Sequence, residues 1–90
     1  MGVILVKMDE NGRVLDYTTD ALKMDGKKFN TILGRAVDLA RIELLAFRSL
    51  GMSDVKSISI TTTDFTVTIG RGAGGNLVIV TLKDEATAST

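Results

Sequence analysis

The polarity of the residues alternates along three stretches of the chain and hardly changes along two others. Val3–Met8 and Leu77–Leu82 are apolar and β-branched almost without a break, whereas Arg13–Thr19, Val55–Thr62 and Phe65–Ile69 alternate. Alternation with a period of two is typical of a strand with one buried face, and a continuous apolar run is typical of a central strand. The pattern therefore predicts five strands, with the two continuous ones in the centre.

A long helix is predicted between the second and the third strand, from about Lys27 to about Leu50. Asp25 precedes it as a candidate N-cap, and Gly51 follows it where a left-handed C-cap glycine belongs. Apolar residues at helical spacing form one broad arc that we expect to pack on the sheet. This arc contains Phe29, Leu33, Ala36, Val37, Ala40, Leu44 and Phe47.

The element order β-β-α-β-β-β predicts one α/β (α+β) domain over residues 1–82 and a polar tail over 83–90. With the continuous strands in the centre, we expect an antiparallel sheet of order 2-1-5-4-3 with the helix on one face. Asn11 and Gly12 predict a type I′ hairpin turn between the first two strands. Gly70–Gly75 is predicted to be a flexible loop between the last two.

One helix covers one face of a five-stranded sheet, so apolar residues of the central strands are expected to remain on the other face. On the first strand this leaves either Ile4 and Val6 or Val3 and Leu5 exposed, with partners on Leu77–Leu82. An apolar patch of this kind indicates an interface.

The third strand is the predicted sheet edge, and its polar positions carry no charge that would repel a second copy. Lys56 is the only charged residue expected to protect this edge from pairing with another strand. On the helix, a narrow apolar seam interrupts the polar arc. Two-fold pairing of two such edges would form a ten-stranded sheet with the two helices side by side. The predicted dimer interface contains Leu39, Ile42, Leu45, Ala46, Lys56, Ser57, Ile58, Ser59, Ile60 and Thr61.

Glu43 is the one carboxylate inside the apolar arc of the helix. We expect it to extend to the margin of the helix–sheet contact or to meet Arg41 or Arg48. The alternative is a buried functional acid.

The composition excludes most chemistry. Eleven basic residues balance eleven acidic ones, histidine and cysteine are absent, and aromatic residues make up 4%. Imidazole bases, thiolate nucleophiles, disulfides and zinc sites are thereby excluded, and neither nucleic acid nor a membrane span is expected. The sequence predicts a soluble cytoplasmic protein that is no enzyme and has no catalytic residue, metal or cofactor.

Two motifs suggest chemistry, but a purely structural interpretation of each is preferred. The glycine-rich segment 70–75 matches G-x-G-x-x-G, but the dinucleotide motif requires a helix after it and here a strand follows. As an accessible loop it is a candidate partner-binding site, formed by Gly70, Arg71, Gly72, Gly74 and Gly75. Thr61, Thr62, Thr63 and Asp64 lack a base that would activate a hydroxyl, so strand propensity explains these threonines better.

A hairpin, one long helix rich in alanine and leucine, and then "DVKSISITTTDFTVTIGRGAGGNLVIVTL" resemble the core of the roadblock family, the dynein light-chain relatives. The corresponding segments are Ala36–Leu50, Ile58–Thr62, Phe65–Gly75 and Leu77–Leu82, in a minimal form without the N-terminal and C-terminal helices. The resemblance implies a homodimer joined through the third strand and the helix. It also implies a platform or regulator for small Ras-like GTPases and for motor or signalling complexes.

Two classes of function follow. The first is a homodimeric scaffold or regulator that binds a small GTPase or another protein. The second is a profilin-like or longin-like ligand-binding or sensory domain that uses the open face of the sheet. A pocket of several hundred cubic ångströms on that face would favour the second class.

Overall fold

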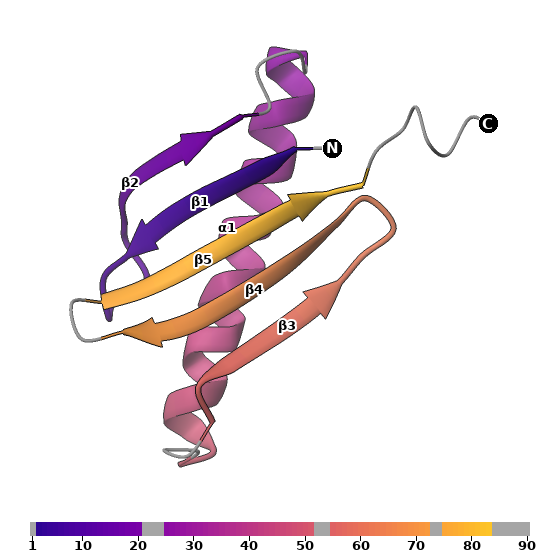
Figure 1. The fold of residues 1–90 in the computed structure, drawn as a ribbon. Helices are drawn as coiled ribbons and strands as arrows, with labels where there is room; N and C mark the ends of the chain where they lie inside the picture. The colour runs from indigo at the N-terminus through magenta and orange to yellow at the C-terminus, as the bar shows by residue number, and fades with distance from the viewer. Residues whose placement is uncertain (1, 21–24, 52–54, 73–74, 84–90) are drawn as a thin grey trace.

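A computed structural model of the chain describes residues 2–20, 25–51, 55–72 and 75–83. Within these ranges the elements follow the predicted order. They are β1 (Val3–Met8), β2 (Val14–Thr19), α1 (Gly26–Ser49), β3 (Ser57–Thr61), β4 (Phe65–Gly72) and β5 (Gly75–Leu82) (Figure 1). From residue 84 onward, the predicted polar tail lies outside the described residues.

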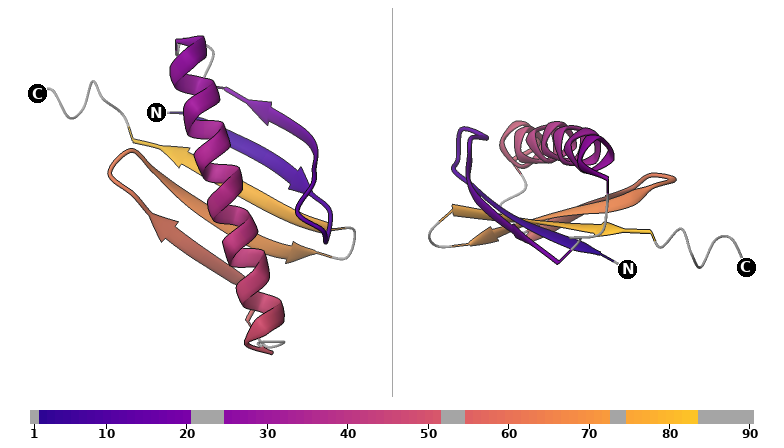
Figure 2. Two further views of the ribbon diagram at one scale, coloured as in Figure 1. Left: turned by 180° about the vertical axis from the view of Figure 1, so that it is seen from behind. Right: turned by 90° about the horizontal axis from the view of Figure 1, so that it is seen from above.

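The five strands form one antiparallel sheet in the order β2-β1-β5-β4-β3, which confirms the predicted topology. β1 and β5 are neighbours in the interior of the sheet, and each pairs with a strand on both sides. α1 crosses one face of the sheet diagonally, from β2 toward the start of β3 (Figure 2). Among the described residues, no helix lies on the opposite face.

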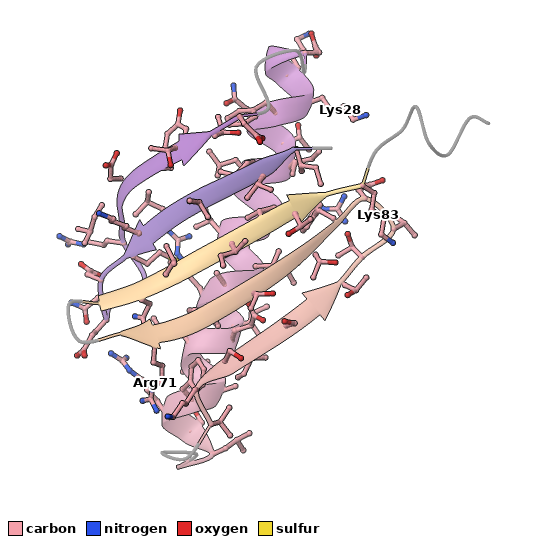
Figure 3. The ribbon with its side chains drawn as sticks, in the orientation of Figure 1. Lys28, Arg71 and Lys83 are labelled. Carbon is pink, nitrogen blue, oxygen red and sulfur yellow. The ribbon has the colours of Figure 1, made fainter. Side chains whose placement is uncertain are left out.

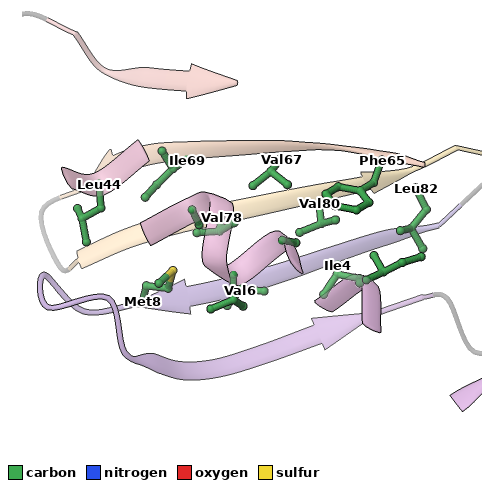
Figure 4. Packing of buried hydrophobic residues seen from close by; sticks show 14 of the residues in the cluster. Ile4, Val6, Met8, Leu44, Phe65, Val67, Ile69, Val78, Val80 and Leu82 are labelled. Carbon is green, nitrogen blue, oxygen red and sulfur yellow. The ribbon is translucent and has the colours of Figure 1, made fainter. Parts of the chain in front are cut away.

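The hydrophobic core lies between α1 and the face of the sheet beneath it (Figure 4). Its sheet residues are Ile4, Val6, Met8, Phe65, Val67, Ile69, Val78, Val80 and Leu82, and its buried helix residues are Ile32, Ala36, Val37, Ala40, Leu44 and Phe47. Burial of each large side chain contributes roughly 1.5–3 kcal/mol. The core therefore fixes which face of the sheet the helix covers.

Both predicted ends of α1 are confirmed. The Asp25 carboxylate accepts a hydrogen bond from the Lys28 N–H at 3.2 Å, which satisfies one of the free donors of the first turn. At the other end, the Leu50 N–H donates to the Ala46 carbonyl at 3.1 Å, and Gly51 adopts a φ of 61°. A left-handed glycine at this position ends the helix because it turns the chain without a Cβ clash.

The predicted type I′ turn between β1 and β2 is wrong. A type I′ turn needs two central residues with positive φ, but only Gly12 has one, at 83°. The Gly12 N–H donates to the Asp9 carbonyl, and the Asp9 N–H donates to the Arg13 carbonyl. One Asp9 carboxylate oxygen also accepts the N–H groups of Asn11 and Arg13, both at 2.9 Å. The aspartate side chain therefore selects a longer turn with a single left-handed glycine.

The loop predicted over Gly70–Gly75 is much shorter. β4 continues to Gly72 and β5 begins at Gly75, because the antiparallel ladder between the two strands continues to that pair. Gly75 has a φ of 133°, and a Cβ there would lie 3.0 Å from the Met8 carbonyl oxygen, so the chain needs glycine at this point. Gly74 lies outside the described residues.

Replacing Gly34 by alanine is expected to stabilise the protein. Gly34 lies inside α1, and a Cβ built there meets nothing within 4 Å. Alanine restricts the unfolded chain and suits a helix better, which is worth about 0.5–1 kcal/mol. Urea unfolding should show a higher midpoint with an unchanged slope. An unchanged or lower midpoint would indicate that another surface packs against Gly34 in solution.

Candidate functional site

β3 is an edge strand whose outer backbone groups have no partner in the sheet. The Thr62 N–H donates to the Phe65 carbonyl at 2.8 Å, which fixes the alternation of inward and outward groups along the ladder with β4. By this alternation, the residues with outward N–H and C=O groups are Ser57, Ser59 and Thr61. They form a row of free donors and acceptors that a further strand can pair with.

The side chains of β3 leave this edge uncharged. Ile58 and Ile60 are half-buried on the helix side, and the residues between them are exposed on the other side. The hydroxyl groups of Ser59 and Thr68 are 2.7 Å apart and hydrogen-bonded to each other, so they do not cover the edge. Lys56, which was predicted to guard the edge, stands immediately before β3.

The opposite edge, β2, is better protected. An Asp16 carboxylate oxygen accepts the Tyr17 N–H at 2.8 Å, so a side chain already satisfies one backbone donor. The charge of Asp16 also disfavours the approach of another strand. Tyr17 is further held by the ring of Phe29, with the ring centroids 6.2 Å apart. β3 is therefore the less protected edge of the sheet.

One flank of α1 carries exposed apolar residues toward β3. A guanidinium nitrogen of Arg35 lies 3.8 Å from the Asp64 carboxylate, which identifies this flank as the one that faces the β3–β4 turn. Leu39, Ile42 and Ala46 follow Arg35 at spacings of four, three and four residues, so they line the same side. Leu39 packs against the core, but Ile42 is 59% exposed. We call these three residues the apolar flank.

Leu45, which was predicted to belong to the same seam, lies on the other flank. It lines a depression of about 190 Å³ together with Arg41, Arg48 and the β1–β2 turn. Leu50, four residues after Ala46, extends the apolar flank instead and is 67% exposed. Leu50 is not among the predicted interface residues, and its spacing of four residues from Ala46 was the signal that could have identified it.

Glu43 is not at the margin of the helix–sheet contact, and that prediction is wrong. It is 1% exposed, and neither carboxylate oxygen has a hydrogen-bond partner in the described part of the chain. Arg41 donates to the Gly12 carbonyl and Arg48 to the Glu10 carbonyl, at 2.9 and 2.6 Å, so both guanidinium groups turn toward the β1–β2 turn. Burial raises the pKa of Glu43 to about 7.

The face of the sheet away from α1 is largely apolar on β1 and β5 (Figure 3). Leu5 and Leu77 are 40% and 42% exposed, and Leu15 on β2 is 61% exposed. A shallow hollow of about 620 Å³ lies over the ends of β3, β4 and β5. Its lining residues are Lys7, Met8, Leu15, Ser57, Thr68, Gly70, Arg71, Gly72, Gly75, Asn76, Leu77 and Ile79. We call this surface the open face.

Arg71 belongs to the sheet and not to a mobile loop. Its N–H donates to the Lys56 carbonyl at 3.0 Å, and its guanidinium lies 4.6 Å from the ring centroid of Phe47. Figure 3 shows Arg71 at the end of β4 near the start of β3. It therefore fastens the C-terminal half of α1 to the sheet, and a role in partner binding stays a prediction.

Thr62 has a structural role in the β3–β4 turn. The Thr62 hydroxyl donates to the Phe65 carbonyl at 3.0 Å and accepts the N–H groups of Asp64 and Phe65. Within the described ranges, no three acidic, histidine or cysteine residues gather into a group that could hold a metal ion. In the same ranges, no helix has the length and apolar character of a membrane span.

Comparisons with known proteins do not assign a family. No family model matches the chain, and no curated protein is similar to it in sequence. The candidate site is therefore defined by geometry: the free edge of β3, the apolar flank of α1 and the open face of the sheet.

Proposed function

We propose that this chain is a non-catalytic homodimeric scaffold or regulator that binds other proteins. The observation that carries the proposal is the unprotected edge of β3 next to the apolar flank of α1. Antiparallel pairing of two β3 strands about a two-fold axis satisfies the outward backbone groups of both copies. The same operation keeps both helices on one face and brings the two apolar flanks toward each other.

The size of the chain supports pairing as well. A domain of 90 residues buries only a modest share of its unfolded surface, and this chain has no cysteine to form a disulfide. Ile42 and Leu50 remain more than half exposed in one copy. A second copy that covers them adds apolar burial that a single helix and sheet cannot supply.

For the client of the dimer, we propose a small Ras-like GTPase or a larger signalling or motor assembly in the cytoplasm. These are the partners implied by the resemblance to the roadblock family. The equal numbers of acidic and basic residues favour a protein client over nucleic acid.

Ser59→Pro should convert the dimer into a monomer. Proline removes the outward N–H of Ser59 but none of the bonds to β4, and edge strands tolerate proline for this reason. The matched control is Ser59→Ala, which removes the hydroxyl and keeps the N–H. Light scattering should give a monomer mass for the proline variant alone, with circular dichroism showing that both variants fold. A dimeric proline variant would contradict pairing through β3.

The hollow on the open face favours a second candidate, a ligand-binding or sensory domain of profilin-like or longin-like type. Its volume of about 620 Å³ suits a small apolar molecule. A ligand-detected NMR screen of small apolar acids tests this candidate. Specific binders that are lost in Leu77→Lys would support it, and a screen without binders would remove its support.

A further inference from the structure

We propose that the last two turns of α1, residues 43–49, form a pH-sensitive switch that is docked on the sheet at acidic pH and opens increasingly as the pH rises toward 7. The trigger is the ionisation of Glu43. Three features carry the proposal: the position of this carboxyl group inside the helix–sheet contact, the charges around it and the contacts that hold the segment on the sheet. The proposal does not depend on pairing through β3.

Glu43 belongs to the row of α1 residues that faces the sheet. Ala40 precedes it by three residues and Phe47 follows it by four, and these two side chains are 0% and 2% exposed. Glu43 itself is 1% exposed, and neither of its carboxylate oxygens has a hydrogen-bond partner in the described part of the chain. Because its neighbours along the row are covered as well, we expect the carboxyl group to reach water only when the helix moves.

The elements around Glu43 do not compensate a negative charge there. The helix-facing residues of β1, β3 and β5 are uncharged, and on β4 the guanidinium of Arg71 stacks on an aromatic ring of α1. On α1, Arg41 and Arg48 donate to the β1–β2 turn, and Asp38 pairs with Arg41. The charged residues at the same end of the sheet that are exposed are Lys7, Glu10 and Lys56. An ionised Glu43 in the docked segment is therefore a buried charge without a bonded partner, which is costly.

This cost gives the opening of the segment a defined pH dependence. Burial raises the pKa of Glu43 from 4.5 to about 7, and an opened segment returns the carboxyl group to water and to its ordinary pKa. Below pH 4.5 the group is protonated in both states, and above pH 7 it is ionised in both. Between these values it ionises only in the open state, so opening becomes more favourable as the pH rises. Each unit of difference between the two pKa values corresponds to about a tenfold change in the opening constant.

Arg41 marks the boundary between the part of α1 that opens and the part that stays docked. Its Nε donates to the Gly12 carbonyl at 2.9 Å, and the buried residues before it are Ile32, Ala36, Val37 and Ala40. After it, the apolar contacts with the sheet come from Leu44 and Phe47. Unwinding from the end of the helix hydrates Glu43 and breaks fewer contacts than lifting all of α1 does. Helix ends also open more readily than helix centres.

The test is amide hydrogen exchange in the 15N-labelled protein, followed by NMR at pH 4.5, 6 and 8 and corrected for the intrinsic exchange rate of each amide. The opening constant of the amides in residues 43–49 should rise at least about a hundredfold from pH 4.5 to pH 8. It should hardly change with low concentrations of urea, because a local opening exposes little surface. The amides in the centres of β1 and β5 should show a strong urea dependence, since they exchange through global unfolding.

Two variants separate Glu43 from the other titrating groups. Glu43→Gln carries no charge, so it should abolish the rise and keep the segment docked at pH 8. Glu10→Gln is the matched control, because it removes a carboxylate from an exposed position and should leave the rise unchanged. A 13C NMR titration of the Glu43 carboxyl group in the wild-type protein needs no variant. Its midpoint should lie at the pH at which the opening constant levels off.

Opening constants in residues 43–49 that do not change with pH would overturn the proposal, as would the same rise in Glu43→Gln. A urea dependence equal to that of β1 and β5 would show that only global unfolding exposes Glu43, which also contradicts a local switch. If the carboxyl group titrates near pH 7 while the segment stays equally protected, the side chain reaches water without movement of the helix, and the proposal is wrong.

Discussion

The free energy of unfolding is expected to fall by about 3 kcal/mol as the pH rises from 4.5 to 7, and then to stay level. The pKa of Glu43 is about 7 in the folded protein, against an ordinary value of 4.5. Below 4.5 the carboxyl group is protonated in both states, so burial carries no ionisation cost. Between pH 4.5 and 7 the carboxyl group ionises in the unfolded chain but stays protonated in the folded protein, so the free energy of unfolding falls as the pH rises. Above pH 7 it is ionised in both states and the difference stays constant. Each unit of difference between the two pKa values corresponds to about 1.36 kcal/mol.

The glutamine variant isolates this effect from other titrating groups. Glu43→Gln has nearly the same shape but no charge, so it should match the wild type near pH 4.5 and exceed its stability by about 2–3 kcal/mol at pH 8. Urea unfolding at several pH values measures the difference. The helix-facing side chains of β1, β4 and β5 offer Glu43 no cation other than Arg71, which stacks on Phe47. Parallel curves for the two proteins would show that Glu43 reaches water or a partner in solution.

Ile42→Glu is expected to raise the dissociation constant of the proposed homodimer at least about a hundredfold. Ile42 is 59% exposed in the apolar flank, and the two-fold axis of the proposed dimer would place two copies of the new carboxylate close together. Loss of a central apolar contact typically costs 2 kcal/mol or more, and each tenfold change corresponds to about 1.4 kcal/mol. Sedimentation equilibrium over a range of concentrations measures the change.

Leu45→Glu is the matched control for this variant. Leu45 has the same exposed fraction as Ile42, 59%, but it lies on the other flank, next to Arg41 and Arg48. The variant should therefore remain a dimer. Dissociation of Leu45→Glu and not of Ile42→Glu would move the interface to the flank that faces the β1–β2 turn.

The topology of the sheet could be predicted because the position of a strand in the sheet affects the pattern of apolar residues in its sequence. The continuous apolar runs at Val3–Met8 and Leu77–Leu82 identified the central strands, and the ends of α1 followed from Asp25 and Gly51. These features depend on side chains that are near one another in the sequence or that repeat with a fixed period. The order of the strands followed from two rules: continuous strands are central, and strands joined by a hairpin are neighbours.

Other features depended on contacts that no period reveals. The Asp9 side chain changed the type of the β1–β2 turn, and the ladder between β4 and β5 shortened the loop predicted over Gly70–Gly75. Glu43 was expected at the margin of the helix–sheet contact or near Arg41 or Arg48, but it is buried and both arginines bind carbonyl groups of a distant turn. A helical wheel gives the angle of each residue and not the position of its partners.

The candidate site was partly visible in the sequence. The uncharged polar positions of β3 and the apolar seam of the helix were both recognised, but the seam was treated as one surface. The structure keeps Ile42 on the flank that faces the β3–β4 turn and places Leu45 over a separate depression. The hollow at Gly70 could not be predicted, because it requires the alignment of β3, β4 and β5.

The most direct test is an isotope-filtered NOE experiment on an equal mixture of 13C,15N-labelled and unlabelled protein. If two copies pair through β3, contacts between copies should appear among the backbone protons of Ser57–Thr61 and between side chains of the apolar flank. The particle should have twice the 9.6 kDa mass of one chain. A monomer without such contacts, or contacts confined to β2 or to the open face, would contradict the homodimeric scaffold.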